Sequence, residues 1–217
     1  MTAPAGTVSG DGAASGQAPG GALGQAPGGA SGQATAASSQ APAAARAASD
    51  VAAAGPSKVA TIDWSDYQAL IQLYSNYASA VDSNDWDLWP EFFTEDCVYR
   101  IVPRENDERG WPLATLGFDN RRMLLDRVYG IKETLFHDPY YQRHVVGAPV
   151  VRSVDANGIR AEANYAVFRT KLSEPSVVFN VGRYRDLVVR TEVGLKFRER
   201  VCVYDTELIP NSIIYPI

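Results

Sequence analysis

The sequence has 217 residues, 46% of them hydrophobic, and its 20 lysines and arginines are outnumbered by 25 aspartates and glutamates, giving a formal net charge of −5. This balance supplies no basic surface for a nucleic-acid backbone, and no run of about 18 apolar residues is present for a membrane span. A Rieske cluster uses two Cys and two His, and a mononuclear iron triad uses two further His. With two Cys and two His in all, this chain cannot hold both centres, and we expect it to bind no iron on its own.

Residues 1–57 differ sharply in composition from the rest of the chain. They are almost entirely Ala, Gly, Ser, Pro and Gln, and they include no aromatic residue. Such a segment buries too little apolar surface to offset the entropy of an ordered backbone. We therefore predict a disordered tail over residues 1–57, followed by a single domain over residues 58–217.

Helices are expected in the first part of that domain. Thr61–Val81 carries apolar and aromatic side chains at the spacing of an amphipathic helix. Asp85–Phe93 places its large aromatic residues on one side, although Pro90 fits only near a first turn or at a break. A further helix is predicted over Asp119–Tyr129, where apolar residues again recur at helical spacing.

The remainder of the domain is predicted to be extended. Strands are expected at Val98–Val102, Arg143–Val154, Ile159–Leu172, Val177–Val189 and Leu195–Tyr204. Gly147 and Pro149 interrupt the second of these, which indicates a bulge or a sheet edge. Helices followed by an antiparallel meander indicate an α+β fold, with the helices packed on one face of a curved sheet.

The register of the last hairpin can be predicted from charge. With Val189 opposite Leu195, Arg185 faces Glu199, whereas a slip of one residue puts Arg185 opposite Arg200. Like charges directly opposite each other cost free energy, so the first register is favoured. The polar face of this hairpin would then carry Tyr184, Asp186, Lys196, Arg198 and Arg200.

The two histidines are the candidates for proton transfer. Asp82, at the predicted end of the first helix, could orient His144 as a general base within an internal cavity. We favour a structural role for both residues, because one His and one Asp far apart in sequence form a weak signal. A metal site built from His137, Asp138 and His144 is disfavoured, since their spacing matches no common ligand pattern.

The two cysteines give no sign of catalysis. Cys97 and Cys202 are far apart, match no CxxC pattern and accompany no signal peptide. We therefore expect a reduced, cytoplasmic compartment, no disulfide, and two small semi-buried hydrophobic side chains.

Two segments have the composition of a protein interface. Tyr140, Tyr141 and Arg143 combine aromatic and guanidinium groups, which are enriched at interfaces, although packing at a strand entry is an open alternative. The run Ile209–Ile217 is unusually apolar, so we expect it to pack against another surface. Together with the last hairpin, these segments predict contacts with partner chains through Tyr140, Tyr141, Arg143, Arg198, Arg200, Ile214, Tyr215 and Ile217.

Longer blocks of sequence resemble a known family. PRENDERGWPL (103–113), RVYGIKETLFHDPYYQRHVVG (127–147), CVYDTELIPNSIIYPI (202–217) and YASAVDSNDWDLWPEFF (77–93) are similar to the small, or beta, subunits of aromatic-ring-hydroxylating oxygenases. The nearest likeness is to the small subunits of salicylate 5-hydroxylases. The resemblance extends from about Trp64 to Ile217 and leaves out the tail.

This resemblance implies a fold and a set of partners. The fold would be the nuclear-transport-factor-2-like cone, in agreement with the predicted order of helices and strands. The Rieske [2Fe-2S] cluster and the mononuclear iron would belong to a large alpha subunit, while beta chains support assembly, commonly as a hexamer of three alpha and three beta chains. A ferredoxin and a reductase would be indirect partners.

Two classes of function follow. In the first, the chain is a non-catalytic subunit of an oxygenase that hydroxylates salicylate to gentisate in aromatic catabolism, with electrons delivered from NADH by partner proteins. In the second, it is a stand-alone cavity enzyme of the same fold, a dehydratase or isomerase that uses Asp82 and His144. The resemblance favours the first.

Overall fold

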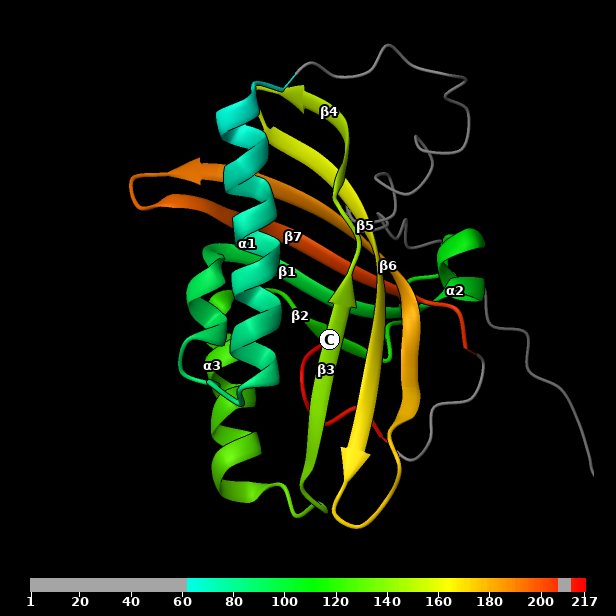
Figure 1. Ribbon diagram of the computed structural model, residues 1–217. Coiled ribbons are helices and arrows are strands. Elements are labelled where there is room, and N and C mark those ends of the chain that lie inside the picture. The colour runs from blue at the N-terminus through cyan, green and yellow to red at the C-terminus, as the bar shows by residue number, and fades with distance from the viewer. Residues whose placement is uncertain (1–61, 207–211) are drawn as a thin grey trace, which may run out of the picture. The chain divides into compact units, whose positions relative to one another are not determined.

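A curved sheet with helices against its concave side forms the domain in the computed structural model, which describes residues 62–206 and 212–217 (Figure 1). The tail predicted for residues 1–57 lies outside the described residues. The α-helices are α1 (Trp64–Asp82), α2 (Arg104–Glu108) and α3 (Arg121–Tyr129), with a 3₁₀ helix η2 (Trp89–Phe92) and a π-helix η3 (Gly130–Thr134). The strands are β1 (Phe93–Pro103), β2 (Leu116–Phe118), β3 (Tyr140–Val146), β4 (Val150–Asp155), β5 (Gly158–Lys171), β6 (Val177–Thr191) and β7 (Gly194–Tyr204).

The start of helix α1 is set by its N-cap residue, Asp63. The side chain of Asp63 accepts a hydrogen bond from the main-chain N–H of Asp66 at 2.8 Å, so the helix starts at Trp64 rather than at Thr61. Of its predicted apolar stripe, Leu70, Tyr74, Tyr77, Ala78 and Val81 are buried, whereas Ile71 is exposed; Leu73, which was not predicted to be part of the stripe, is buried as well. Within residues 62–206 and 212–217, no helix is long and apolar enough to cross a membrane.

Several short elements differ from the sequence prediction. The helix expected over Asp85–Phe93 is reduced to the short η2, whose second residue is Pro90. The elements α2, β2 and η3 were not predicted, because each is too short to show a hydrophobic period.

The strand order across the sheet is β2-β1-β7-β6-β5-β3, with β4 also paired to β5. All pairs are antiparallel except β1 with β7, which is parallel. The prediction of a purely antiparallel sheet is therefore wrong at this pair. Most of the domain separates these two strands in sequence, so no hairpin forces them to run in opposite directions. The α+β arrangement with helices on a curved sheet is confirmed.

The sheet edge opposite β2 is a broken strand. β3 pairs with residues 165–171 of β5, and β4 pairs with residues 158–162 of the same strand. The chain between β3 and β4 contains Gly147 and Pro149, which confirms the interruption predicted within Arg143–Val154.

The predicted register of the last hairpin is wrong. Arg190, not Val189, lies opposite Leu195, and an irregularity between Leu187 and Val188 adds a further shift. Beyond that irregularity Asp186 lies opposite Arg200. The charge argument failed because Arg185 faces an uncharged residue in this register, so no like-charge pair forms.

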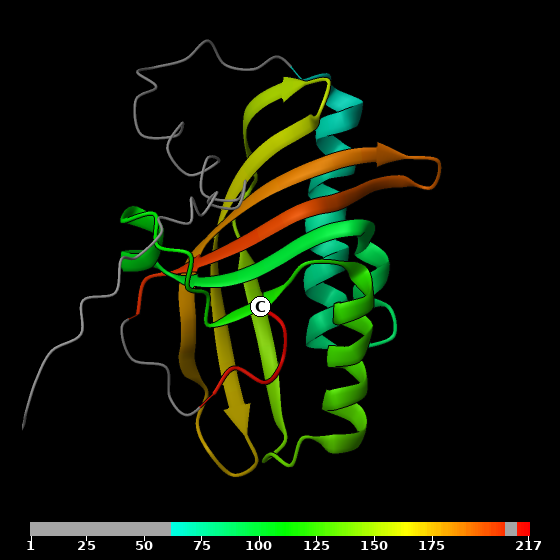
Figure 2. The same cartoon turned by 180° about the vertical axis from the view of Figure 1, so that it is seen from behind.

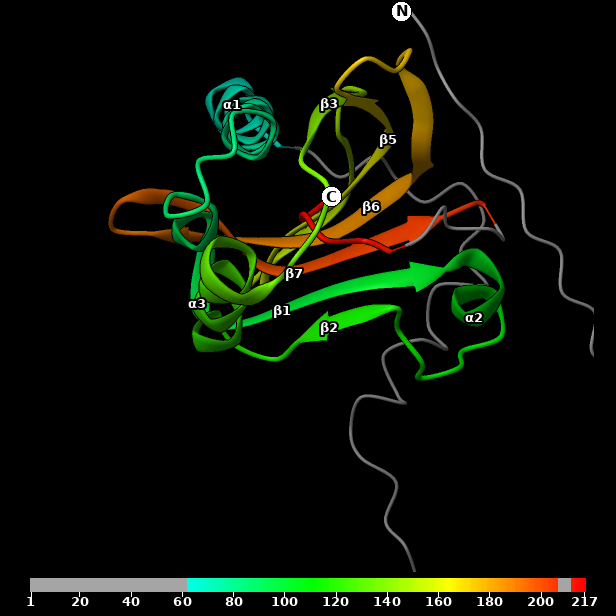
Figure 3. The same ribbon diagram turned by 90° about the horizontal axis from the view of Figure 1, so that it is seen from below.

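A glycine in β6 lets this strand approach β7 closely. A Cβ atom on Gly182 would overlap the main-chain oxygen of Val203, so this position of β6 admits glycine alone. The strands curl around a central space in which the described C-terminal residues lie, as Figures 2 and 3 show. We call this space the cone interior.

Candidate functional site

The structure brings Asp82 and His144 together, as the cavity-enzyme hypothesis requires. Nδ1 of His144 lies 2.6 Å from Oδ1 of Asp82. The main-chain N–H of His144 also donates to both carboxylate oxygens, at 3.1 and 3.0 Å. Asp82 ends α1 and His144 lies in β3, so the pair joins the helix to the edge of the sheet.

The same pair is closed to solvent. The side chain of His144 is 0% exposed and that of Asp82 is 5% exposed. Nε2 of His144, the atom that would take a substrate proton, is buried without a hydrogen-bond partner. A general base must come within hydrogen-bond reach of its substrate. The geometry therefore favours a structural tie between α1 and β3.

The surface hollows formed by the described residues include two that are lined by neither Asp82 nor His144. One, of about 460 Å³, lies between α1, η2 and the β6–β7 hairpin and includes Leu88 and Val193. The other, of about 400 Å³, lies at the β3 edge and includes Tyr141, Arg143 and Phe168.

A buried ion pair occupies the cone interior beside α1. Arg200 donates to Asp186 from Nη2 at 2.8 Å and from Nε at 3.1 Å, and both side chains are 0% exposed. The guanidinium carbon lies 3.8 to 4.9 Å from the ring centres of Tyr74, Tyr77, Tyr184 and Phe197. Burial opposes the charge on Arg200, but Asp186 raises its pKa above the usual value. Arg200 was expected at a partner interface; because it is enclosed by its own chain, that expectation is wrong.

The C-terminal residues also lie inside the domain rather than on its surface. Ile213, Tyr215 and Ile217 are buried, and Ile214 is half-buried. Tyr140 is buried as well, with its ring centre 4.4 Å from that of Tyr215. Tyr140, Tyr215 and Ile217 were expected to contact partner chains. The structure corrects this, because residues 213–217 of the apolar run pack into their own domain; residues 209–211 lie outside the described residues.

The remaining interface candidates are on the surface. Tyr141 is 69% exposed, and the side chains of Arg143 and Arg198 are 74% and 48% exposed. Tyr141 and Arg143 alternate with inward-facing residues along β3, so they project from the convex side of the sheet edge. Both line the 400 Å³ hollow, where Tyr141 is available to a partner, while Nη1 of Arg143 lies 3.6 Å from Oδ2 of Asp82.

The other histidine has a structural environment. Nε2 of His137 lies 2.8 Å from the hydroxyl of Tyr215, and Asp138 accepts from Nζ of Lys171 at 2.8 Å. Among the described residues, no group of three or more His, Cys, Asp or Glu side chains could hold a metal ion.

Both cysteines are buried and free. Burial raises the pKa of Cys97 to about 11 and that of Cys202 to about 12. At pH 8 about one Cys97 thiol in a thousand would be ionised, and even fewer of Cys202. We expect iodoacetamide to modify neither residue in the folded chain within an hour and both in urea, as read by mass spectrometry. Rapid native labelling of Cys97 would contradict this.

The sequence analysis did not identify several residues that have clear structural roles. Asp107, in the unpredicted α2, accepts from Arg185 and lies 3.7 Å from Arg183, so it clamps the helix to β6. Tyr77 and Tyr99 direct their hydroxyls at the main chain of Ile217. Cys97, Tyr99 and Ile101 occupy alternate positions of β1, which could have indicated the inward direction of Tyr99, but no sequence signal identifies its partner.

Comparison with known proteins places this geometry in a family. Residues 63–201 match the SnoaL-like domain family. The chain is 33% identical over 157 residues to the anthranilate 1,2-dioxygenase small subunit of Burkholderia cepacia, covering 72% of this chain and 98% of that protein. It is 30% identical over 141 residues to the terephthalate 1,2-dioxygenase terminal oxygenase subunit beta 1 of Comamonas sp, covering 65% of this chain and 92% of that protein.

A solved structure agrees with these relatives. The beta subunit assigned to an aromatic-ring-hydroxylating dioxygenase of Novosphingobium aromaticivorans superposes with a TM-score of 0.64 at 30% identity, covering 70% of this chain and 96% of that chain. The similarity spans 92% to 98% of the length of each relative. The chain therefore belongs to the family of beta, or small, subunits of aromatic-ring-hydroxylating dioxygenases.

Proposed function

We propose that this chain is the structural small subunit of a terminal oxygenase that hydroxylates salicylate to gentisate. A large subunit would hold the Rieske cluster and the mononuclear iron, and a ferredoxin and a reductase would carry electrons from NADH. In the overall reaction, salicylate, dioxygen, NADH and one proton give gentisate, water and NAD⁺. The small subunit would contribute to assembly and not to bond breaking.

The observation that carries this proposal is the filled cone interior. An enzyme that used the interior of this fold would need an open path to its acid and base. Here the C-terminal residues, the Arg200–Asp186 pair and large aromatic side chains occupy that space, and His144 is enclosed. A subunit that supports assembly has no need of such a path.

The substrate is proposed from chemistry and resemblance together. The names of two relatives specify anthranilate and terephthalate, which are both aromatic carboxylates. Salicylate differs from anthranilate by a hydroxyl in place of the ortho amino group. Together with the sequence blocks similar to salicylate 5-hydroxylases, this favours salicylate within the class of benzoate-type substrates.

The partner surface is proposed at the convex β3 edge and at β7. Tyr141 and Arg143 are exposed beside a hollow, and Arg198 is exposed on the last hairpin. Exposed Tyr and Arg are the side chains most enriched at the centres of interfaces. The large subunit and other small subunits, in a three-plus-three hexamer, are the proposed occupants.

Co-expression with a large subunit tests the function directly. We expect the two chains to co-purify and, with ferredoxin, reductase and NADH, to convert salicylate to gentisate, while this chain alone converts nothing. Anthranilate, benzoate and terephthalate serve as competing substrates. Turnover by the isolated chain would overturn the structural role. A pure complex that hydroxylates another acid and not salicylate would overturn the proposed substrate.

The 2.6 Å contact between Asp82 and His144 supports a second candidate, a cavity dehydratase or isomerase. We expect His144→Gln and Asp82→Asn to lower the free energy of unfolding by about 1–3 kcal/mol, because each leaves buried polar atoms without their partner. Hydroxylation per assembled complex should stay within about twofold of the parent. Thermal melts and turnover normalised to complex concentration check this.

A matched control separates the two candidates. Asp87→Asn removes an exposed carboxylate that pairs with Lys132, and it should change neither stability nor turnover appreciably. A thousandfold fall in turnover for His144→Gln, with assembly intact, would favour the cavity enzyme over the structural subunit.

A further inference from the structure

Residues 212–217, which we call the C-terminal segment, cross the cone interior without forming a helix or strand. Side chains of the domain donate hydrogen bonds to the segment's main-chain oxygens. Tyr77 and Tyr99 donate to Ile217 at 2.8 and 3.1 Å, Gln142 donates to Pro216 at 3.0 Å, and Arg127 donates to Ile214 at 2.7 Å and to Ile213 at 3.0 Å. The segment is therefore held in the way a bound peptide is held.

An aromatic clamp anchors this segment at Tyr215. The ring centre of Tyr215 lies 4.7 Å from that of Trp86 and 4.4 Å from that of Tyr140. Its hydroxyl lies 2.8 Å from Nε2 of His137. Buried aromatic rings in fitted pockets dominate the affinity of most protein interfaces. Tyr215 is the corresponding anchor of the segment.

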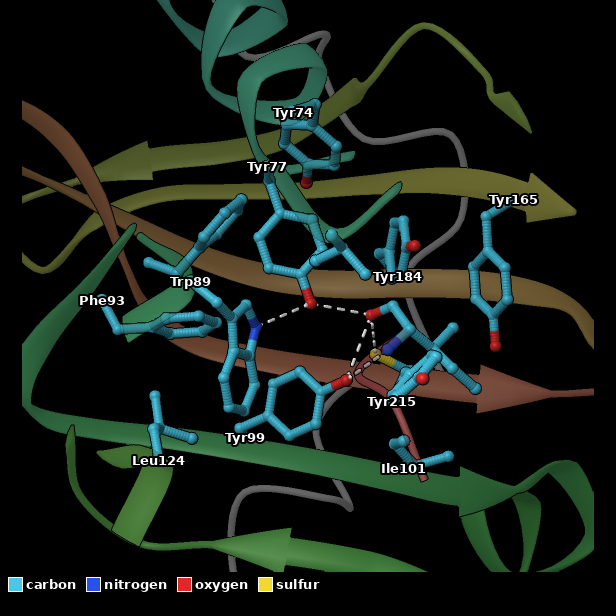
Figure 4. Close-up of a cluster of buried hydrophobic side chains, with 14 of the residues drawn as sticks. Tyr74, Tyr77, Trp89, Phe93, Tyr99, Ile101, Leu124, Tyr165, Tyr184 and Tyr215 are labelled. Carbon is cyan, nitrogen blue, oxygen red and sulfur yellow. Dashed lines mark hydrogen bonds between the residues drawn. The ribbon is translucent and has the colours of Figure 1, made fainter. Parts of the chain in front are cut away.

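The walls of the site are fixed by contacts that do not involve the segment. Nε1 of Trp89 lies 3.3 Å from the hydroxyl of Tyr77, and the rings of Trp89 and Tyr99 meet edge to face at 5.5 Å (Figure 4). The Asp82–His144 pair ties α1, which carries Tyr77, to β3, which carries Gln142. Walls held in this way should keep their shape when the occupant leaves, which lowers the cost of binding it again.

We propose that the cone interior is a peptide-binding site whose intramolecular ligand is the C-terminal segment, and that the emptied site binds the same segment in trans. Its ligand class is a short apolar peptide with free main-chain acceptors and one aromatic ring for the clamp. A short tether supplies an effective concentration of order millimolar, so a trans dissociation constant in the micromolar range keeps the site occupied. The proposal does not depend on which aromatic acid the oxygenase hydroxylates.

The experiment frees the segment after the chain has folded. Residues 207–211 of the full-length chain are replaced by a protease recognition sequence, the purified protein is cut, and the released peptide is removed by dilution and gel filtration. Labelled synthetic peptide Ser-Ile-Ile-Tyr-Pro-Ile is then titrated in and followed by fluorescence anisotropy. We expect saturable micromolar binding and a melting temperature that rises with peptide concentration.

Matched peptides and chain variants define the contacts. A peptide with Ala in place of the residue equivalent to Tyr215 should bind at least about tenfold more weakly, and one with Phe there by only a few-fold. In the cut chain, Gln142→Ala should weaken binding about tenfold, whereas Gln72→Ala, on the exposed side of α1, should leave it unchanged.

Two results would overturn the proposal. In one, the cut chain melts at the same temperature with or without peptide and shows no saturable binding. In the other, the cut chain unfolds and excess peptide does not restore a cooperative melt. The uncut variant, measured in parallel, shows that the inserted sequence itself does not disturb the fold.

Discussion

Replacing Asp186 by alanine should lower the free energy of unfolding by about 3–5 kcal/mol, because the substitution leaves the Arg200 guanidinium charged, buried and without its counter-ion. The nearby rings can offset a small part of this cost through cation–π contact. Urea unfolding followed by circular dichroism measures the change. The midpoint urea concentration should fall, while the dependence of the unfolding free energy on urea concentration stays unaltered.

Two companion variants test the cause. Asp96→Ala removes the exposed partner of Arg198, with a separation of 3.0 Å, and should cost less than about 1 kcal/mol. The double variant Asp186→Leu with Arg200→Met removes both buried charges and should recover most of the stability lost in Asp186→Ala. If the double variant is no more stable than Asp186→Ala, the loss comes from packing and not from the unpaired charge.

Tyr215→Ala should also cost about 3–5 kcal/mol, the range for truncating a large buried aromatic side chain. It empties the clamp between Trp86 and Tyr140 and removes the partner of His137. Thermal unfolding of the isolated chain measures this loss of stability. The expected loss is a property of this chain alone and needs no partner subunit.

Tyr141→Ala is the matched control on the surface. Tyr141 is adjacent to Tyr140 in sequence but 69% exposed, so its truncation should change the stability of the isolated chain by no more than about 0.5 kcal/mol. In the complex, Tyr141→Ala with Arg143→Ala should weaken the oligomer, as measured by light scattering after size-exclusion chromatography. Equal melting temperatures for Tyr215→Ala and the parent would contradict the core position of Tyr215.

The main elements could be predicted because their signals are local. The stripe of α1 and the alternation in β5, β6 and β7 are periodic over many residues, so helix and strand are distinguishable from the sequence. The strand β1 begins at Phe93, five residues before the predicted start at Val98. Its first part was missed because Thr94, Glu95 and Asp96 form a polar run that shows no strand alternation.

The site could be predicted only in part, because its contacts are long-range. The proximity of Asp82 and His144 was a correct hypothesis, but their enclosure depends on how the whole domain closes. The predicted register was wrong because the charge argument compared only two registers, whereas in the observed one Arg185 faces Val201 and Asp186 pairs with Arg200 in the interior. An apolar C-terminal run has the same composition whether it packs into its own domain or against a partner. The sequence therefore does not distinguish the two, and the three-dimensional structure does.

The parallel pairing of β1 with β7 has a consequence for how the chain is made. The ribosome releases β1 long before β7, the last strand of the sheet, has been synthesised, and until then β1 lacks its parallel neighbour. Pairing across so long a stretch of chain slows folding and leaves an unpaired edge in the nascent protein. The final strand thus completes the sheet late, and a ribosome that stalls before residue 194 should leave a product that chaperones retain.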